Sequence, residues 1–170
     1  MKWIIFTGTW KLINQEVEND VRQAVRDVIS LGNGMVTGGA TGVDYIAMDE
    51  WLKHDKECKK LRVFIPANLD NYINDYYKNW CHDPITKDDI EKLEKVLRDI
   101  QSVNQACLLE MKHDGGDITQ NHYDLRHNEE VMFADEVHAF QVNNSTGTQD
   151  TIDKAEKFGL TISLHKKYTI

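Results

Sequence analysis

The sequence predicts an α/β protein of the Rossmann-like class, with three α/β/α layers around a mostly parallel sheet. Short apolar runs alternate with segments whose apolar residues recur at helical spacing, a pattern typical of parallel strands joined by helices. Glycine-rich turns follow several of the apolar runs. The 170 residues contain two prolines and no long polar tract, so we expect one folded domain over residues 1–170.

The first elements follow from short apolar runs and glycines. Residues 3–6 predict a first buried strand. Asn14 is a suitable N-cap for a helix whose apolar residues recur as far as Ile29, and Gly32 and Gly34 are predicted to end this helix. A second strand is expected at residues 35–37.

A second helix and a third strand complete the first half of the chain. The helix follows the turn at residues 38–42, and its apolar stripe is Val43, Ile46, Ala47 and Trp51. The strand is predicted at residues 61–65.

The middle of the chain is less regular. Residues 67–85 carry several aromatic side chains among polar ones and give no clear periodicity. Thr86 and Asp89 resemble a capping box, and the apolar spacing that follows predicts an amphipathic helix as far as Ile100. Residues 106–110 predict a short strand, and residues 113–119 a loop.

Regular alternation returns after Tyr123. A short helix is predicted at residues 125–133, and a strand at residues 136–142. The last helix is expected to begin at Thr148 and end at Gly159, before a final strand at residues 161–164.

The charge balance limits the classes of partner. The 28 acidic residues outnumber the 20 basic ones and give a formal charge of -8, so we expect no nucleic-acid partner. No apolar run is long enough to cross a membrane. The three cysteines have no metal-like spacing, so we predict a cytoplasmic protein with reduced thiols, no metal and no cofactor.

Three predicted strand-to-helix turns combine glycine with hydroxyl side chains. Ligands of such folds bind at the carboxyl ends of the strands, where backbone amides and helix N-termini attract phosphate. We therefore expect the three turns to form one phosphate site, or, in the simpler alternative, to be ordinary turns in which Thr41 caps its helix and Asp44 answers it. The turns are Thr7-Gly8-Thr9, Gly38-Gly39-Ala40-Thr41-Gly42 and Ser145-Thr146-Gly147-Thr148.

These turns match neither of the two standard nucleotide motifs. A dinucleotide motif aligned on Gly39 and Gly42 needs a glycine where Thr37 stands, and a P-loop needs a lysine after its glycines. The sequence therefore disfavours a NAD site and an ATPase.

Arg126 is one of only five arginines and is predicted near the start of a helix, where the helix dipole disfavours a cation. A bound phosphate clamped by the guanidinium would relieve that conflict. The alternative is an ion pair with Glu129 or Glu130.

Two carboxylates and a group of aromatic residues are further candidates. Asp44 and Asp150 lie at the starts of predicted helices, where they bind ribose, act as an acid or base, or simply favour the helix dipole. The aromatic side chains either stack on a base or pack in the core: Trp10, Tyr72, Tyr76, Tyr77 and Trp80.

Several of these motifs together resemble the SLOG superfamily, which includes the DNA-processing protein A family, the LOG family and small YspA/YpsA-like proteins. The resemblance covers about residues 1–66 and 123–165, whereas residues 67–122 match only loosely, as an insert. It is carried by the first strand with Thr7-Gly8-Thr9, by Val36-Thr37-Gly38-Gly39-Ala40-Thr41-Gly42-Val43-Asp44, by Arg126-x-Asn128, by Met132-Phe133-Ala134-Asp135-Glu136-Val137, and by Ser145-Thr146-Gly147-Thr148 with Thr151 and Ala155.

The resemblance implies a Rossmann-like domain that binds a nucleotide-like ligand and forms homo-oligomers. LOG enzymes cleave the base from a nucleoside 5′-monophosphate, with the signature Pro-Gly-Gly-x-Gly-Thr-x-x-Glu and an upstream Arg-Lys pair. Here the leading Pro-Gly-Gly is absent, Thr151 stands at the Glu position with Asp150 beside it, and the pair is Arg126-His127. These departures disfavour glycosidase chemistry.

The leading hypothesis is a binding protein or sensor for a nucleotide or phosphorylated nucleoside derivative. One alternative is a nucleoside 5′-monophosphate N-glycosidase, with Arg126 on the phosphate and Asp150 or Asp44 as acid or base. Another is an assembly subunit with a vestigial pocket. The expected ligand-binding residues are Thr7, Gly8, Thr9, Gly38, Gly39, Thr41, Gly42, Asp44, Arg126, Asn128, Ser145, Thr146, Gly147 and Thr148.

Overall fold

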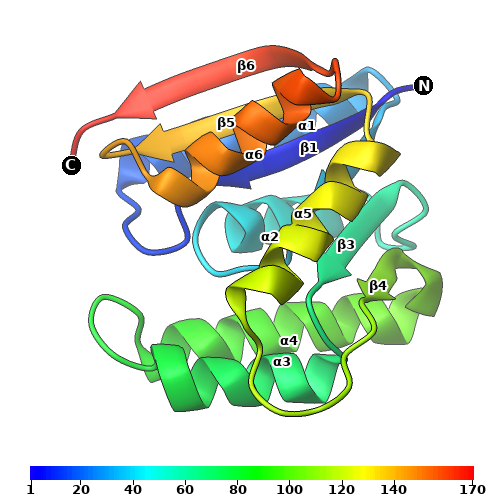
Figure 1. The fold of residues 1–170 in the computed structure, drawn as a ribbon. Helices are drawn as coiled ribbons and strands as arrows, with labels where there is room; N and C mark the ends of the chain where they lie inside the picture. The colour runs from blue at the N-terminus through cyan, green and yellow to red at the C-terminus, as the bar shows by residue number, and fades with distance from the viewer.

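A computed structural model describes residues 1–170 and confirms the α/β, Rossmann-like class (Figure 1). All six strands are parallel and lie in the order β4-β3-β2-β1-β5-β6. The strands are β1 (Trp3–Gly8), β2 (Gly34–Thr37), β3 (Leu61–Ile65), β4 (Leu108–Glu110), β5 (Glu136–Val142) and β6 (Thr161–Tyr168).

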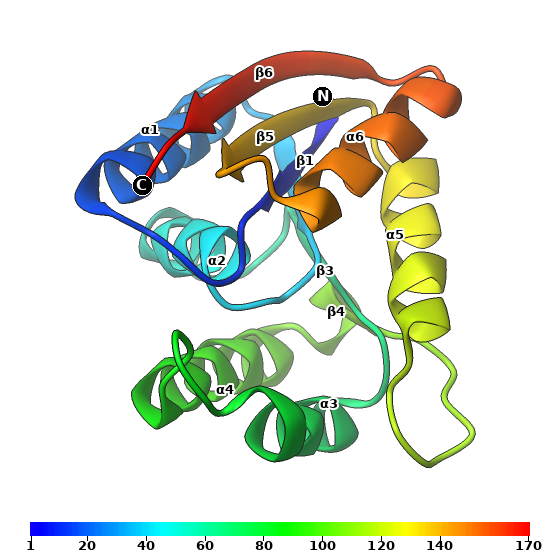
Figure 2. The same cartoon turned by 60° about the vertical axis from the view of Figure 1, so that its left-hand side comes forward.

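Helices cover both faces of this sheet, as Figure 2 shows from the side. The α-helices are α1 (Gln15–Ser30), α2 (Val43–His54), α3 (Leu69–Asp75), α4 (Lys87–Val103), α5 (Gln120–Phe133) and α6 (Thr146–Lys157). A π-helical turn, η1 (Tyr76–Trp80), continues α3, and a 3₁₀ turn, η2 (Gln105–Cys107), precedes β4.

The alternation of side chains along the strands divides the core into two layers. Ile4 and Phe6 of β1 face a large cluster that α1, α2, α3 and α4 complete. Ile5 faces the opposite, smaller cluster, which receives Val131 from α5 and Ile152 from α6. Strands buried on both faces account for the continuous apolar runs in the sequence.

The strand order reverses between β1 and β5. From β1 the chain moves outward through β2 and β3 to β4, and it then returns along α5 to place β5 on the other side of β1. In open parallel sheets such a reversal opens a crevice beyond the carboxyl ends of the two central strands.

Two predicted caps are confirmed. The side chain of Asn14 accepts a hydrogen bond from the Val17 amide at 3.0 Å. The hydroxyl of Thr86 accepts from the Asp89 amide at 3.2 Å, and the Asp89 carboxylate accepts from the Thr86 amide at 2.8 Å. These bonds satisfy amides that the first helical turn leaves free.

Two local predictions about glycine turns are wrong. Gly34 does not end α1, which stops at Ser30, but begins β2. This residue is a glycine because a Cβ there would lie 2.5 Å from the ring of Trp3. Thr41 does not cap α2, because its hydroxyl donates to the Trp10 carbonyl at 2.7 Å and the N-cap residue is Gly42. Gly42 has φ +72 and approaches the chain at Thr9 too closely for any side chain.

Three helix and strand limits also differ from the predictions. α5 begins at Gln120, six residues before Arg126, so Arg126 lies in its second turn and not at its N-terminus. The helix dipole therefore does not disfavour a cation at Arg126 and gives no reason to expect a bound anion there. α6 begins at Thr146, and β6 continues past Leu164 to Tyr168.

The sequence between β3 and α5 is more regular than predicted. α3, η1 and α4 pack beside α2, with Tyr72 and Tyr76 buried between them. This region also forms β4 and extends the sheet at its edge. No helix of the protein combines the length and the apolar composition needed to cross a membrane.

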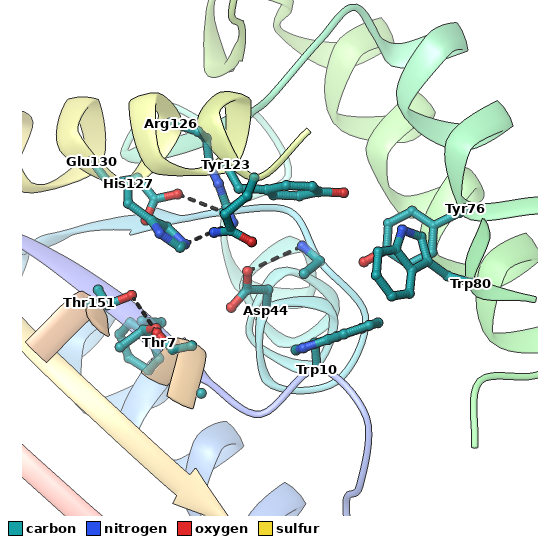
Figure 3. Close-up of a pocket in the computed structure, with 16 residues that line it drawn as sticks. Thr7, Trp10, Asp44, Tyr76, Trp80, Tyr123, Arg126, His127, Glu130 and Thr151 are labelled. Carbon is teal, nitrogen blue, oxygen red and sulfur yellow. Dashed lines mark hydrogen bonds and ion pairs between the residues drawn. The ribbon is translucent and has the colours of Figure 1, made fainter. Parts of the chain in front are cut away.

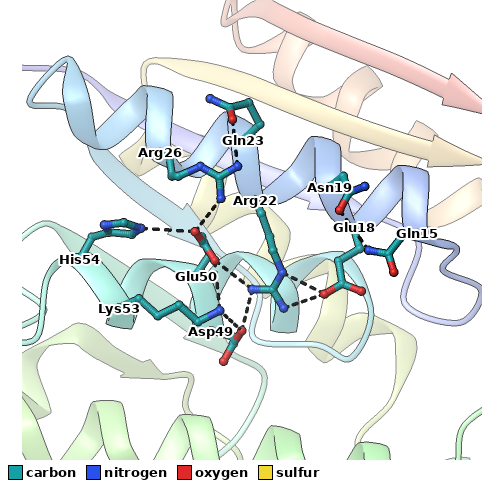
Figure 4. A network of polar contacts seen from close by, with 10 residues as sticks. All are labelled: Gln15, Glu18, Asn19, Arg22, Gln23, Arg26, Asp49, Glu50, Lys53 and His54. Atoms are coloured by element: carbon teal, nitrogen blue, oxygen red, sulfur yellow. Dashed lines mark hydrogen bonds and ion pairs between the residues drawn. The ribbon is translucent and has the colours of Figure 1, made fainter.

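A polar network joins α1 to α2 on the outside of the sheet (Figure 4). Glu50 is its centre and accepts hydrogen bonds from Arg26 at 2.8 Å and from Arg22 and Lys53 at 3.1 Å. Burial alone would raise the pKa of Glu50, but these bonds hold it at about 2. The network fixes the first two helices against each other.

Candidate functional site

A pocket of about 170 Å³ opens at the strand reversal, beyond the carboxyl ends of β1 and β2 and beside the start of α6. Its wall combines backbone from three turns with charged and aromatic side chains. The lining residues are Phe6, Thr7, Gly8, Trp10, Gly38, Ala40, Asp44, Tyr76, Trp80, Gln120, Tyr123, Arg126, His127, Glu130, Gly147 and Thr151.

Each of the three predicted glycine turns contributes one glycine to this pocket. Gly8 ends β1, Gly38 follows β2 directly, and Gly147 lies in the first turn of α6. The turns therefore converge as expected, although only part of each one faces the cavity.

The remaining turn residues hold the turns in place. Gly39 has φ +65 and packs against Val63 and Ile65 of the core. The Thr9 carbonyl accepts from the Val43 amide at 3.0 Å and thereby joins the first two turns. The hydroxyls of Ser145 and Thr148 bond to each other at 2.6 Å.

Eight of the residues predicted to bind ligand do not line the pocket, and their predicted role gains no support from the geometry. They are Thr9, Gly39, Thr41, Gly42, Asn128, Ser145, Thr146 and Thr148.

Arg126 occupies the space that the missing side chain of Gly38 leaves. A Cβ on Gly38 would lie 1.4 Å from Nη1 of Arg126 and 2.9 Å from Oε1 of Glu130. Gly38 is thus a glycine because the guanidinium packs directly on its Cα.

Hydrogen bonds fix the guanidinium in this position. Nη1 donates to Oε1 of Glu130 at 3.1 Å, and Nη2 donates to Nε2 of His127 at 3.0 Å. Both Arg126 and Glu130 are buried, at 6% and 2% exposure. The ion pair with Glu130 that the sequence offered as an alternative is present, inside the pocket.

His127 is neutral and has a defined tautomer. Burial and the neighbouring charges of Arg126 and Lys154 lower its pKa to about 2. Because Nε2 accepts from Arg126, the proton lies on Nδ1, which is 3.4 Å from Oδ2 of Asp150. The imidazole therefore positions Arg126 and does not add a positive charge.

Two carboxyl groups in the pocket have raised pKa values. Burial raises the pKa of Asp44 to about 6, although Arg126 and the Ala40 amide oppose the shift. Burial also raises the pKa of Glu130 to about 7, against the attraction of Arg126. At neutral pH these groups are close to titration, which is the range that acid–base chemistry needs.

A second acidic group lies next to the pocket but is already neutralised. The ligand atoms of Asp124, His127 and Asp150 lie within 4.8 Å of one another, a geometry that suits a metal ion. Lys154 donates to Asp150 at 2.6 Å and to Asp124 at 3.2 Å, so an ammonium group stands where the ion would. Asp150 itself does not line the pocket.

Aromatic side chains form one end of the pocket. In Figure 3, Trp10, Tyr76 and Trp80 lie at one end, Thr7 and Thr151 at the other, and Asp44 between them. The rings of Trp10 and Trp80 meet edge to face with centroids 4.9 Å apart, and the Trp80 indole donates to Asp75 at 3.1 Å. Of the predicted aromatic candidates, Trp10, Tyr76 and Trp80 line the pocket, whereas Tyr72 is fully buried in the core.

Seven lining residues were not predicted as ligand contacts: Phe6, Ala40, Gln120, Tyr123, His127, Glu130 and Thr151. The spacing of α5 contains the signal, since positions 120, 123, 127 and 130 recur at intervals of three and four around Arg126. A longer predicted α5 would have placed these residues on the face that Arg126 shares.

Comparison with solved structures identifies the class of fold. The chain is similar over 99% of its length to DNA processing protein A from Helicobacter pylori, with a TM-score of 0.65 and 16% identity. It is also similar over 95% of its length to the structural-genomics structure of TM1055, of which it covers 72%, with a TM-score of 0.53 and 15% identity. The protein therefore shares the fold of DNA processing protein A, in agreement with the fold that the sequence predicted.

At these identities the likeness concerns the fold. The chain spans 64% of the length of the Helicobacter pylori protein, which binds single-stranded DNA. The expectation that this protein has no nucleic-acid partner is therefore not supported by this comparison. No protein-family model and no curated protein sequence matches the chain.

Proposed function

We propose that this protein binds a nucleotide or a phosphorylated nucleoside derivative, as a sensor or binding protein. The observation that carries this proposal is the pocket at the strand reversal, which joins glycines of three turns to Arg126, Asp44 and an aromatic wall. Backbone amides suit phosphate, carboxylates suit hydroxyl groups, and aromatic faces suit a base.

The lining suggests how such a ligand lies. The phosphate binds at the end formed by Gly8, Gly147 and Thr151, because the first turn of α6 offers amides and the positive end of its dipole. The base stacks at the opposite end, against Trp10 and Trp80. The ribose then lies between them, beside Asp44, in the order that Figure 3 shows.

A thermal-shift and calorimetric screen of nucleoside 5′-monophosphates tests the proposal. A ligand that binds only the folded protein raises its melting temperature. Gly147→Val is the variant that tests the phosphate end of the pocket. A Cβ at this exposed residue meets no atom within 4 Å, so we expect the variant to fold. Glu156→Val, an exposed change elsewhere on α6, is the matched control.

We expect the parent protein and Glu156→Val to be stabilised by a nucleotide, and Gly147→Val to keep its melting temperature but lose the ligand response. The proposal is overturned if no nucleoside monophosphate and no ribose 5-phosphate binds, or if Gly147→Val binds with parental affinity.

A second candidate function is N-glycosidic hydrolysis of a nucleoside monophosphate, which the raised pKa of Asp44 favours. Water would add to the anomeric carbon as the bond to the base breaks, protonated Asp44 would supply the proton that the departing base needs, and the proton lost by the water would return to Asp44. Asp150 drops out of this scheme because it lies outside the pocket, paired with Lys154. Incubation with nucleoside monophosphates should release free base, and Asp44→Asn should abolish the release.

We also propose that the ligand is a small molecule and not a nucleic acid. We further propose that the protein forms homo-oligomers and that it resides in the cytoplasm. The outer surface of α5 exposes Leu125, Met132 and Phe133, which are suited to contact with a second copy. All three cysteines are free thiols, as a reducing compartment maintains them. Light scattering of the parent and of Met132→Lys tests the oligomer.

A further inference from the structure

The middle of the pocket is acidic. Asp44 and Glu130 are 7% and 2% exposed, and both line the cavity. The only cation among the lining residues is Arg126, whose charge Glu130 already balances at 3.1 Å. Attraction for a phosphate is therefore weak here, and the place favours a group that donates hydrogen bonds.

Each of the two carboxyl groups keeps one oxygen available. Asp44 accepts from the Ala40 amide through Oδ2 at 3.2 Å, and Glu130 accepts from Arg126 through Oε1. The Thr37 hydroxyl and the Gly38 amide also approach the carboxyl group of Asp44, but neither makes a hydrogen bond of normal geometry to it. Oδ1 of Asp44 and Oε2 of Glu130 therefore have no hydrogen-bond partner within the protein, and both oxygens are accessible. Two nearly buried side chains thus present free acceptors to one space.

The two acceptors stand on opposite elements around Gly38. Glu130 comes from α5 and Asp44 from the first turn of α2, and the Coulombic repulsion between them contributes to the raised pKa of Glu130. A ligand that donates to both oxygens relieves that repulsion. A vicinal diol provides two donors on adjacent carbons and no charge that must be desolvated.

We propose that Asp44 and Glu130 together recognise the free 2′- and 3′-hydroxyl groups of a ribose, so that the ligand is a ribonucleotide with an unmodified diol. This inference rests on the proposed nucleotide site and names its substrate class. The pocket then rejects 2′-deoxyribonucleotides, 2′,3′-cyclic nucleotides and nucleotides linked through the 3′-oxygen, including internal positions of DNA.

The physical basis of this selectivity is the cost of an unpaired acceptor. A site that is built to receive a hydroxyl group leaves its buried acceptor unsatisfied when the hydroxyl is missing. Because Glu130 is only 2% exposed, water does not easily replace the lost donor.

Two sugar phosphates that lack a base provide the direct test. Calorimetry compares ribose 5-phosphate with 2-deoxyribose 5-phosphate, and adenosine 5′-monophosphate with its 2′-deoxy, 3′-deoxy and 2′,3′-cyclic counterparts. We expect the parent protein to bind each free diol at least about tenfold more tightly than its modified counterpart.

Glu130→Gln should bring the ratio between the ribo and deoxy ligands close to one, and the matched control Glu129→Gln, an exposed neighbour on α5, should keep it. If Glu130→Gln does not fold, the comparison of ribo and deoxy ligands on the parent protein still tests whether the pocket recognises the diol. Equal affinity for the ribo and deoxy ligands overturns this inference and leaves the proposed function standing. Absence of binding by every ligand overturns both.

Discussion

Nη1 of Arg126 lies 1.4 Å from the point at which a Cβ of residue 38 would stand. The guanidinium of Arg126, on α5, therefore packs directly against Gly38, which follows β2 and lies 88 positions earlier in the chain. Glu130 and His127 accept hydrogen bonds from Nη1 and Nη2 of Arg126 and so hold the guanidinium against Gly38. In the second glycine turn, Gly38 therefore contacts Arg126, whereas Gly39 packs against the core.

Gly38→Ala should displace Arg126 and break its ion pair with Glu130. The backbone of Gly38 has no positive φ, so the added methyl acts through the collision alone. We expect the free energy of unfolding to fall by about 1–3 kcal/mol, because two buried charged groups lose their partners. Affinity for a nucleotide should fall at least about tenfold.

Chemical denaturation with Gly147→Ala as the control checks this prediction. A Cβ at Gly147 meets nothing within 4 Å, and alanine favours the helix by roughly 0.5–1 kcal/mol. Equal stability of Gly38→Ala and the parent protein would show that the guanidinium has another position available.

Trp10→Ala should weaken the binding of nucleotides but not the binding of ribose 5-phosphate. Stacking of a base on an aromatic ring is worth about 1–3 kcal/mol, and Trp10 forms the aromatic end of the pocket with Trp80. Calorimetry with both ligands separates the base from the sugar phosphate. A similar loss for both ligands would place the base elsewhere and would mean that Trp10 only supports the turn.

Local sequence signals predicted most of the fold and the convergence of the three turns. The apolar residues of β3 and β5 located both strands without error, because most of the buried positions in these strands are apolar. Asn14 and the Thr86–Asp89 pair gave the starts of α1 and α4, since caps are local chemistry.

The site itself depends on contacts between distant residues, and these were harder to predict. The capping role expected of Thr41 failed because Trp10, 31 positions away, offers its carbonyl to the hydroxyl. Glu130 was seen only as a partner of Arg126, since its burial depends on how α5 crosses the end of β2. The start of α5 was missed because residues 120–124 are all polar apart from Tyr123.

Glu50→Gln should destabilise the protein by about 1–3 kcal/mol at neutral pH. Glu50 is 5% exposed and accepts from Arg22, Arg26 and Lys53, so the uncharged amide leaves these cations without their common partner. Glu91→Gln is the control, because its pair with Lys87 is exposed and contributes little to stability. Equal losses in the two variants would show that the network joining α1 and α2 adds nothing beyond a surface pair.

The same glutamate should affect acid stability. Its pKa of about 2 in the folded protein lies below the ordinary value of 4.5, so its contribution is present above the ordinary value and is lost as the pH falls toward 2. Acid unfolding of Glu50→Gln should therefore be less steep than that of the parent in this range.

Glu130 should have the opposite effect on stability. Its pKa is about 7 in the folded protein against 4.5 ordinarily, so between these values the folded state binds more protons than the unfolded state. The contribution of Glu130 to the free energy of unfolding therefore falls as the pH rises from about 5 to about 8, by on the order of 2 kcal/mol. Ligand affinity should rise over the same range, because the ionised carboxylate is the better acceptor for a ribose hydroxyl.

Comparison of the parent protein with Glu130→Gln separates these effects from those of the buried histidines and of Asp44, whose pKa of about 6 lies in the same range, because these groups are present in both proteins. Denaturation and calorimetry at about pH 5, 6, 7 and 8 give the two pH dependences. The difference in unfolding free energy between parent and variant should change across this range, and the rise in ligand affinity should be smaller in the variant. Parallel stability curves would mean that Glu130 keeps an ordinary pKa, and the acidic centre of the pocket would then be ionised throughout.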